Sequence, residues 1–216
     1  MNREEAWKRL AACGKDMVET GLTRGSGGNL SLFLPEEGAM WISTSGSSLS
    51  ELREEDVVKL SLQGELREGD RVPSSEWRLH SRLYQERPEL GAILHGHTIY
   101  ATALSLLRKP LPASHYMVAL AGGEVACADY ATFGSQALAE NACRAMEGRK
   151  AVLLANHGIL TAGEDLEEAL AIAEEVEYCA RLYLLAQSAG EAVVLDDREM
   201  DRVLDKFTHY GQPEQE

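Results

Sequence analysis

Ala92-Ile93-Leu94-His95-Gly96-His97 joins a short apolar run directly to a pair of histidines. Such a run is typical of a buried strand, and the spacing after it predicts a helix over about residues 98–107. Because side chains on a strand alternate between its two faces, both imidazoles of the pair should point the same way. The stretch therefore predicts a buried strand that ends in two potential ligands.

Helical and extended patterns alternate outward from this stretch. Helices are expected over residues 3–22, 75–87, 135–146 and 165–187, and a further helix should carry the chain at least to Phe207. Extended segments are expected over residues 29–34, 40–43, 57–62, 125–128 and 151–155. The alternation, without repeats or linkers, indicates an α/β fold: a single domain over residues 1–216 with helices layered on a mixed or antiparallel sheet.

The charge of the chain limits its partners. The 216 residues include 21 Lys and Arg against 35 Asp and Glu, which gives a formal net charge of -14 at pH 7. Such a surface repels nucleic acid and anionic lipid, so neither is expected as the main partner. An anionic small ligand would need a local arrangement of donors.

Two further features bear on location and thiol state. Residues 1–7 carry acids where a signal peptide has a basic start, and no run of about 18 apolar residues occurs, which predicts a cytoplasmic protein. The four cysteines are far apart and form no C-x-x-C pair. Reduced, packed thiols without disulfides are therefore expected.

A third histidine favours a metal site. An isolated H-x-H pair arises readily by chance or bridges backbone groups. His157, however, ends a second apolar run much as His95 and His97 end the first. Catalytic zinc often takes three protein ligands and keeps one position open. A scattered, imidazole-rich set of this kind predicts a catalytic metal rather than a structural one.

Three segments rich in hydroxyl and backbone donors indicate an anion site. They are the glycine-rich residues 25–31, the serine-rich residues 43–48, and residues 73–75. Capping or loop solubility explains each segment alone, but free amides and hydroxyls also bind phosphate. In a chain of this charge the three segments together predict a small phosphate group held by neutral donors.

The third donor segment also predicts the start of a helix. Ser74 or Ser75 is expected as its N-cap, with Glu76 in the first turn. By default Glu76 is then a surface acid favoured by the helix dipole, and His80 is its partner one turn on. The local pattern alone assigns neither residue a chemical role.

Short motifs occur in order along almost the whole chain. They are Gly28-Asn29-Leu30-Ser31, Ser45-Gly46, Ser74-Ser75-Glu76-Trp77-Arg78, His95-Gly96-His97, His115-Tyr116-Met117, Tyr130-Ala131-Thr132-Phe133-Gly134, His157-Gly158 and Phe207-Thr208-His209-Tyr210-Gly211. Each motif is weak alone, but together they closely resemble the class II aldolase/adducin family. The resemblance implies a three-layer α/β/α fold around a central, mainly antiparallel sheet, and a homotetramer with active sites between subunits.

The resemblance also assigns roles, position by position. It makes His95, His97 and His157 the ligands of one Zn2+ per subunit, and Glu76 a catalytic acid/base that also reaches the metal in the resting state. The substrate phosphate would be held by Gly28, Asn29, Ser45, Gly46, Ser74 and Ser75. Tyr116 and Tyr210 would act in catalysis from a neighbouring subunit, and Phe133 would line the aldehyde side of the substrate pocket.

The implied reaction is retro-aldol cleavage of a small phosphorylated sugar. The substrate would be a ketose 1-phosphate such as L-fuculose 1-phosphate, and the products dihydroxyacetone phosphate and an aldehyde such as L-lactaldehyde. Cleavage leaves negative charge on the phosphate-bearing half, which a metal can stabilise without a Schiff-base lysine. The motifs contain no lysine, which agrees with this chemistry.

Other functions stay open at this point. Relatives in the family act as decarboxylases, dehydratases or 4-epimerases on other sugar phosphates. The epimerases carry an aspartate in the segment that matches His115 to Gly123, and this sequence has no acid there, which favours the aldolase. A non-catalytic, adducin-like assembly module is disfavoured because such modules generally lack a complete metal triad.

Overall fold

A computed structural model describes residues 1–209. Its α-helices are α1 (Arg3–Glu19), α2 (Trp77–Glu86), α3 (Tyr100–Leu106), α4 (Gln136–Ala145), α5 (Leu166–Ala189) and α6 (Asp197–His209). Its strands are β1 (Asn29–Leu34), β2 (Ala39–Ser43), β3 (Val57–Ser61), β4 (Leu66–Glu68), β5 (Ala92–Gly96), β6 (Cys127–Ala128), β7 (Ala151–Leu154) and β8 (Gly158–Gly163). A 3-10 helix, η4 (Tyr116–Ala121), is the longest of the short connecting turns.

The strands form one sheet in the order β4-β3-β2-β1-β5-β8-β7-β6. Neighbouring strands are antiparallel except β6 and β7, which are parallel. At the centre, Asn29 of β1 pairs with His95 of β5, and Gly96 pairs with Ile159 of β8. The start of β1, the end of β5 and the start of β8 therefore meet at the same end of the sheet.

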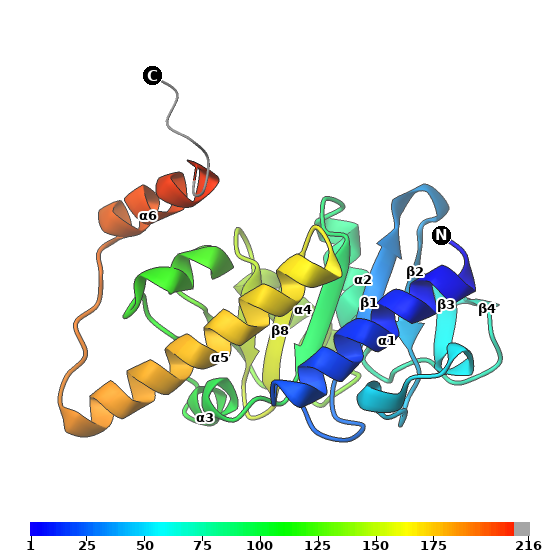
Figure 1. Ribbon diagram of the computed structural model, residues 1–216, viewed down its shortest axis with the longest axis horizontal. Helices are drawn as coiled ribbons and strands as arrows, with labels where there is room; N and C mark the ends of the chain where they lie inside the picture. The colour runs from blue at the N-terminus through cyan, green and yellow to red at the C-terminus, as the bar shows by residue number, and fades with distance from the viewer. Residues whose placement is uncertain (210–216) are drawn as a thin grey trace.

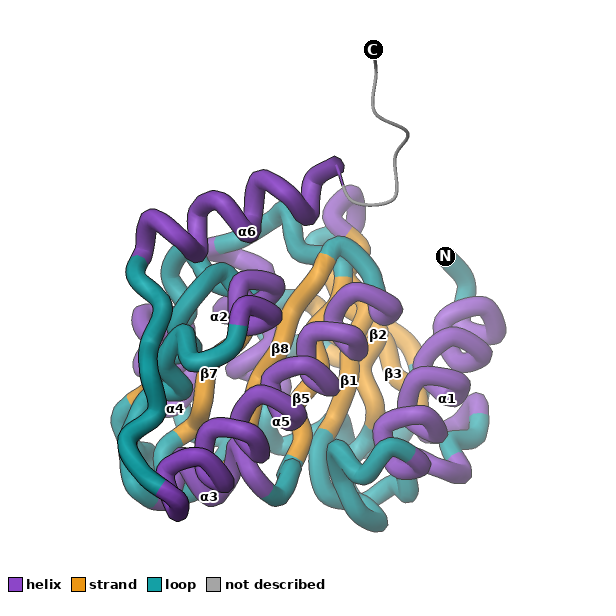
Figure 2. Tube along the Cα trace, turned by 60° about the vertical axis from the view of Figure 1, so that its left-hand side comes forward, coloured by secondary structure: helices purple, strands orange, loops and turns teal. Residues whose placement is uncertain are grey.

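Helices cover both faces of this sheet (Figures 1 and 2). α1, α3 and α5 pack on one face, and α2 and α4 pack on the other. Each strand contributes side chains to both hydrophobic layers, because successive side chains point to opposite faces of the sheet. Ala92 and Leu94 of β5 join the core under α5, whereas Ile93 joins the core under α2 and α4. The expected three-layer α/β/α fold with a mainly antiparallel sheet is confirmed.

The start of α2 differs from the prediction. Glu76, not Ser74 or Ser75, is the N-cap residue, and the helix begins at Trp77. Ser74 Oγ instead accepts a hydrogen bond of 3.3 Å from the backbone N–H of Glu76. The serine therefore shapes the turn that enters the helix, and the helix proper starts later than its hydroxyls suggest.

Two strands are absent from the sequence-based assignment. β8 is buried along its whole length, so its sequence shows no alternation of apolar and polar residues. β4 is exposed at all three positions and pairs only with β3 at the end of the sheet. β8 matters more, because it lies beside β5 and directly follows His157.

The C-terminal helix packs as its apolar spacing predicts. Met200 of α6 is buried, and Val203 and Phe207 pack against the same core as α5.

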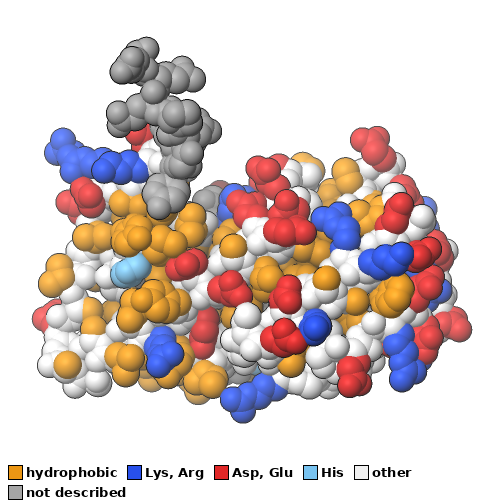
Figure 3. Space-filling model, viewed as in Figure 1, with side chains coloured by type: hydrophobic (Ala, Val, Ile, Leu, Met, Phe, Trp, Pro, Cys, Tyr) orange, Lys and Arg blue, Asp and Glu red, His pale blue; other side chains and the backbone are white. Residues whose placement is uncertain are grey.

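Acidic side chains are spread over the α1 and α5 face, with apolar ones gathered below α6 (Figure 3). All four cysteines are free. Within residues 1–209, none of the helices combines the length and apolar character that crossing a membrane requires.

Candidate metal and phosphate site

Three histidines converge where the central strands end. His95 lies in β5, His97 follows that strand, and His157 lies in the turn between β7 and β8. Their ligand nitrogens lie within 4.8 Å of one another, and 3.0 Å separates His95 Nε2 from His97 Nε2. The imidazoles that the sequence predicts to bind a metal are therefore close enough to share one ion.

The proton on His95 is placed by its backbone partner. His95 is fully buried, and its Nδ1 donates to the carbonyl oxygen of Ile159 at 2.8 Å. Because a carbonyl only accepts, Nε2 of the neutral ring carries a lone pair toward the site. Burial, aided by His157 and His97, lowers the pKa of His95 well below its usual value, and burial also lowers the pKa of His97. Both rings are then neutral near pH 7, which is the form that binds metals.

Glu76 completes the cluster from the start of α2. Its Oε2 lies 3.1 Å from His95 Nε2, and its Oε1 lies 3.6 Å from His157 Nε2. Asn29 Nδ2 donates to Oε2 at 3.0 Å, whereas the buried Oε1 has no hydrogen-bond partner among the described residues. Glu76 is 6% exposed, so the default interpretation as a surface acid is wrong. The turn at Ser74 directs the carboxylate inward instead.

This arrangement of donor atoms fits a divalent cation. The lone pair of His95 Nε2 faces a carboxylate oxygen of Glu76 at 3.1 Å, so two acceptor atoms lie in contact. A buried contact of this kind is unfavourable unless a cation lies beside it. Three imidazoles and one carboxylate are ligands that Zn2+ accepts.

A cavity of about 350 Å³ opens beside the histidines. All three donor-rich segments contribute to its lining, through residues 26–29, 44–46 and 74–75, and Glu76 lines it as well. His97 and His157 also line it, so the metal cluster and the donor segments share one space. The lining contains no Lys or Arg. An anion in this cavity would therefore be held by amide and hydroxyl donors.

Backbone hydrogen bonds hold the second and third donor segments together. The N–H of Ser45 donates to the Val72 carbonyl at 2.9 Å, and the N–H of Ser74 donates to the Ser43 carbonyl at 3.0 Å. The two segments are distant in sequence, so neither reveals the other by its local pattern. Their pairing brings both sets of hydroxyls to one wall of the cavity.

The first donor segment depends on Gly28. Its φ is +89°, and a Cβ at this position would lie 2.4 Å from the carbonyl oxygen of His95. Both the left-handed backbone and the close approach require glycine. The loop can therefore lie directly against the strand end that carries the histidines.

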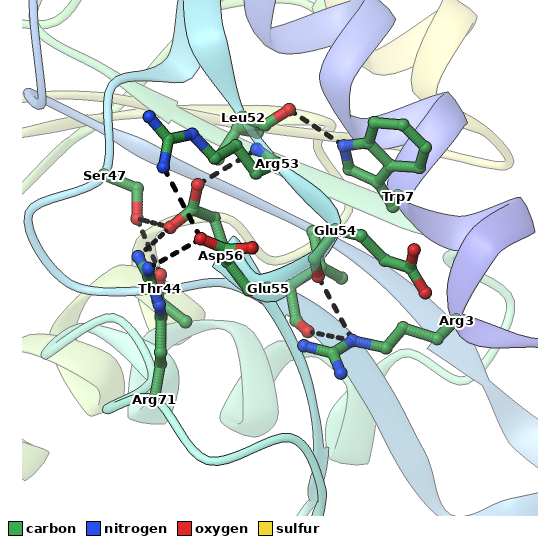
Figure 4. A network of polar contacts seen from close by, with 11 residues as sticks. Arg3, Trp7, Thr44, Ser47, Leu52, Arg53, Glu54, Glu55, Asp56 and Arg71 are labelled. Atoms are coloured by element: carbon green, nitrogen blue, oxygen red, sulfur yellow. Dashed lines mark hydrogen bonds and ion pairs between the residues drawn. The ribbon is translucent and has the colours of Figure 1, made fainter.

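Asp56 holds the second donor segment in place through a network of polar contacts (Figure 4). Its carboxylate accepts from Ser47 Oγ at 3.0 Å and from the backbone N–H of Arg53 at 2.9 Å, and it forms an ion pair with Arg71. Its carbonyl accepts from the N–H of Thr44 at 2.9 Å. Because Asp56 is buried, these bonds fix the loop between Thr44 and Ser47, which contains the proposed phosphate donors.

Asp56→Ala is expected to disorder this loop. The change leaves buried donors without an acceptor, which should lower the free energy of unfolding by about 1–3 kcal/mol. It should also raise KM for a phosphorylated substrate more than it lowers kcat. Chemical denaturation and steady-state kinetics test both effects.

Glu55→Ala is the matched control for Asp56. Glu55 is an exposed partner of the same Arg71, at 3.0 Å. Its loss should change the free energy of unfolding by no more than about 0.5 kcal/mol. Equal effects of the two variants on stability and KM would show that Asp56 does not support the loop.

The predicted aromatic residues differ in their positions. Phe133 lines the cavity and is 67% exposed. Tyr116 is 48% exposed and does not line it; its ring centroid lies 6.2 Å from that of Phe207 in α6. Tyr210 lies outside the described residues. The described part of one chain therefore brings Phe133, but not Tyr116, to the cavity.

Six further lining residues have no individual role in the sequence-based assignment. They are Ser26, Gly27, Thr44, Tyr130, Ala131 and Asn156. Thr44 belongs to the serine-rich segment, and Asn156 directly precedes His157, so proximity to assigned residues is the signal that could have found them. Asn156 also has a left-handed φ of +55°, which turns the chain between β7 and β8.

Known proteins resemble this chain over most of its length. Residues 8–184 match the family described as "Class II Aldolase and Adducin N-terminal domain". The 5-deoxy-D-ribulose 1-phosphate aldolase of Bacillus thuringiensis serovar kurstaki is 44% identical over 205 residues, which are 95% of this chain and 96% of that protein. The L-fuculose phosphate aldolase of Escherichia coli (strain K12) is 40% identical over 213 residues, which are 98% of each. A solved L-fuculose 1-phosphate aldolase structure has a TM-score of 0.93 and 52% identity, covering 96% of this chain and 98% of that one.

Proposed function

Because the chain belongs to the class II aldolase and adducin family, we propose that it cleaves a ketose 1-phosphate by a retro-aldol reaction into dihydroxyacetone phosphate and an aldehyde. One observation carries this proposal. The histidine cluster, the buried Glu76 carboxylate and the cavity of neutral donors form a single site. The phosphate would occupy the donor-lined part of the cavity, with the carbon chain directed toward the histidines.

In this proposal His95, His97 and His157 hold one Zn2+ per chain, and Glu76 reaches the ion when no substrate is bound. A divalent metal supplies stabilisation of the negative charge that develops on the phosphate-bearing half. The lowered pKa values of His95 and His97 and the contact between His95 Nε2 and Glu76 support this ligand set. The Ile159 carbonyl keeps the His95 ring in the orientation and tautomer that ligation needs.

Glu76 would move the proton at the carbon of the dihydroxyacetone phosphate half. Cleavage removes a proton from a hydroxyl on the aldehyde half and adds one to this carbon, so a group beside the carbon must carry a proton. The carboxylate borders the cavity, and Asn29 already occupies Oε2. Oε1, without a hydrogen-bond partner in the described chain, is the atom left to exchange the proton.

The aldehyde half would be completed by a neighbouring subunit. We propose a homotetramer in which Tyr116 and Tyr210 of one chain act at the site of the next, where Tyr116 contacts the oxygen of the departing aldehyde. Phe133 would line this side of the pocket. The exposure of Tyr116 away from its own chain's cavity supports such a role.

Ser75→Ala tests the phosphate site. Ser75 is exposed and lines the cavity, so its hydroxyl is available to a ligand. Loss of one hydrogen bond to a charged group is worth about 1.5–3 kcal/mol, which corresponds to a KM raised about 10- to 100-fold. The kcat should change little, because the hydroxyl contacts the substrate equally before and during cleavage.

Ser50→Ala is the control for Ser75. Ser50 is an exposed serine near the second donor segment that does not line the cavity. Its KM should match that of the unaltered chain. An unchanged KM in Ser75→Ala would remove Ser75 from the phosphate site.

L-fuculose 1-phosphate is the first candidate substrate. The solved L-fuculose 1-phosphate aldolase at 52% identity supports it. 5-Deoxy-D-ribulose 1-phosphate is the second candidate, supported by the Bacillus thuringiensis relative at 44% identity. The two substrates share the dihydroxyacetone phosphate half. They differ in the aldehyde released, which is lactaldehyde from the first and acetaldehyde from the second.

A direct comparison of kcat/KM separates these candidates. The Zn2+-loaded protein would be given each substrate, and dihydroxyacetone phosphate would be measured by enzymatic reduction. We expect release from both, with the higher kcat/KM for L-fuculose 1-phosphate. A higher value for 5-deoxy-D-ribulose 1-phosphate would establish the second candidate. Epimerisation, decarboxylation or dehydration of a sugar phosphate without release of dihydroxyacetone phosphate would establish a related activity. Binding of the sugar phosphates without any turnover would indicate an assembly module.

A further inference from the structure

We propose that His80 is a positioning residue for Glu76, because it fixes the orientation of the Asn29 amide that holds the Glu76 carboxylate. The inference rests on the proton-transfer role proposed for Glu76. His80 is fully buried in α2, one turn after Glu76, and it does not line the cavity. It can therefore influence the reaction only through its neighbours.

A chain of buried polar side chains runs from Tyr84, in the last turn of α2, to Glu76. Tyr84 Oη lies 2.7 Å from Ser31 Oγ, which lies 2.7 Å from His80 Nδ1. His80 Nε2 hydrogen bonds to Asn29 Oδ1, and Asn29 Nδ2 lies 3.0 Å from Glu76 Oε2. All five side chains are buried. The chain thus links the core between α2 and β1 to the carboxylate in the cavity.

Two sequence spacings bring these residues together. Asn29 and Ser31 lie two positions apart on β1 and share one face of the sheet. Glu76, His80 and Tyr84 follow one another at intervals of four at the start and along one side of α2. The strand and the helix therefore present matching rows of polar groups within an otherwise apolar contact.

The chemistry of each partner determines which atom donates in each hydrogen bond of this chain. Asn29 Oδ1 is a carbonyl oxygen and only accepts, so His80 Nε2 must donate. Burial lowers the pKa of His80 to about 3, so the ring is neutral and its Nδ1 accepts. Ser31 Oγ then donates its single proton to Nδ1, and Tyr84 Oη donates toward Ser31. In this arrangement every member of the chain has a partner, and Tyr84 Oη also lies 3.2 Å from the Ser31 carbonyl oxygen, which can accept from it.

The hydrogen bond from His80 Nε2 to Asn29 Oδ1 favours one orientation of the Asn29 amide beside Glu76. The amide oxygen and nitrogen have nearly the same shape, so packing alone does not choose between them. In the opposite orientation, Asn29 would turn its oxygen toward Glu76 Oε2 and repel the carboxylate. With its proton on Nε2, the neutral His80 ring stabilises the orientation that gives Glu76 a donor. Glu76 is then held without a Lys or Arg partner.

Two substitutions at His80 separate positioning from packing. In His80→Gln, the side-chain NH2 can take the place of Nε2 and still donate to Asn29. In His80→Asn, the shorter side chain can accept from Ser31 in the place of Nδ1 but no longer reaches Asn29. We expect kcat to fall about 10- to 100-fold in His80→Asn, as for a catalytic group displaced by about 1 Å, and to fall much less in His80→Gln.

A double variant tests whether His80 acts through Glu76. Once Glu76→Gln has removed proton transfer, His80→Asn should cause little further loss of kcat. Metal content and the thermal midpoint of each variant would be measured alongside kcat with the Zn2+-loaded chain. If His80→Asn does not fold, Ser31→Ala takes its place, because it removes the donor to Nδ1 while keeping the imidazole. Ser31→Ala should lower kcat while KM changes less.

The tautomer of His80 gives a readout independent of activity. Nitrogen-15 NMR of the imidazole should show a proton on Nε2 and none on Nδ1. A proton on Nδ1, equal kcat in His80→Asn and His80→Gln, or losses that add fully in the double variant would overturn the positioning role. A fast Glu76→Gln variant would instead refute the proposed function of Glu76. A slow Glu76→Gln beside a fast His80→Asn would refute this inference alone.

Discussion

His95→Ala is expected to lower kcat/KM at least about 1,000-fold, because a Lewis-acid metal supplies several kcal/mol of charge stabilisation. His95 is the most buried of the three histidines and lies between His97 and Glu76. Without its imidazole, the remaining ligands should hold the ion poorly. The measurement is kcat/KM together with the amount of metal bound per chain.

The fold should survive this change, although with a lower thermal midpoint. The substitution leaves the Ile159 carbonyl without its imidazole donor, which costs about 1–3 kcal/mol, but both hydrophobic cores stay complete. His115→Ala is the matched control, since His115 is the N-cap of η4, does not line the cavity and should leave the metal content unchanged. Full activity of His95→Ala with no metal bound would refute the metal site.

Glu76→Gln is expected to lower kcat by about 100-fold or more, the usual contribution of a positioned proton-transfer group. Glutamine has the size of glutamate, and its amide oxygen can still accept from Asn29 Nδ2. The side chain therefore keeps its place but cannot exchange a proton at Oε1. Metal content should fall less than in His95→Ala, because the three imidazoles are untouched.

Hydrogen exchange in dihydroxyacetone phosphate isolates the step assigned to Glu76. Transfer of solvent deuterium to this product requires proton movement at its carbon and no aldehyde. Glu76→Gln should slow it as much as it slows cleavage. Glu86→Gln, an exposed position of the same helix, serves as control and should exchange normally. Normal exchange in Glu76→Gln would assign the proton transfer to another group.

Strands with a local signature could be predicted from the sequence, and others could not. β1 was predicted at its observed bounds, 29–34, because turn residues delimit its apolar run. β8 was missed because it is buried on both faces and bounded by Gly158 and Gly163, so neither alternation nor a polar end marks it. These residues form a strand because they lie between β5 and β7, and that position is a property of the whole sheet.

The site shows the same division. Motifs in the sequence led to the histidines and to the donor segments, which the fold brings to one cavity. The local pattern at Glu76 predicts a surface acid, and only the family resemblance implies that it faces the metal, because its inward direction depends on how Ser74 shapes the turn before α2. The contacts of Asp56 and His80 are also tertiary. Asp56 bonds Ser47 across a turn, and His80 bonds Asn29 on a different element, so the local pattern around either residue does not reveal its partner.

The pairing of Asn29 with His95 makes the site depend on the register between β1 and β5. A slip of one residue between β1 and β5 would turn Asn29 and Ser31 to the opposite face of the sheet, into the apolar layer under α1 and α5. The polar row along α2 would then face a strand without partners. A misregistered chain would therefore lose both stability and the Glu76 site in one step, so cleavage activity should report correct strand pairing during refolding.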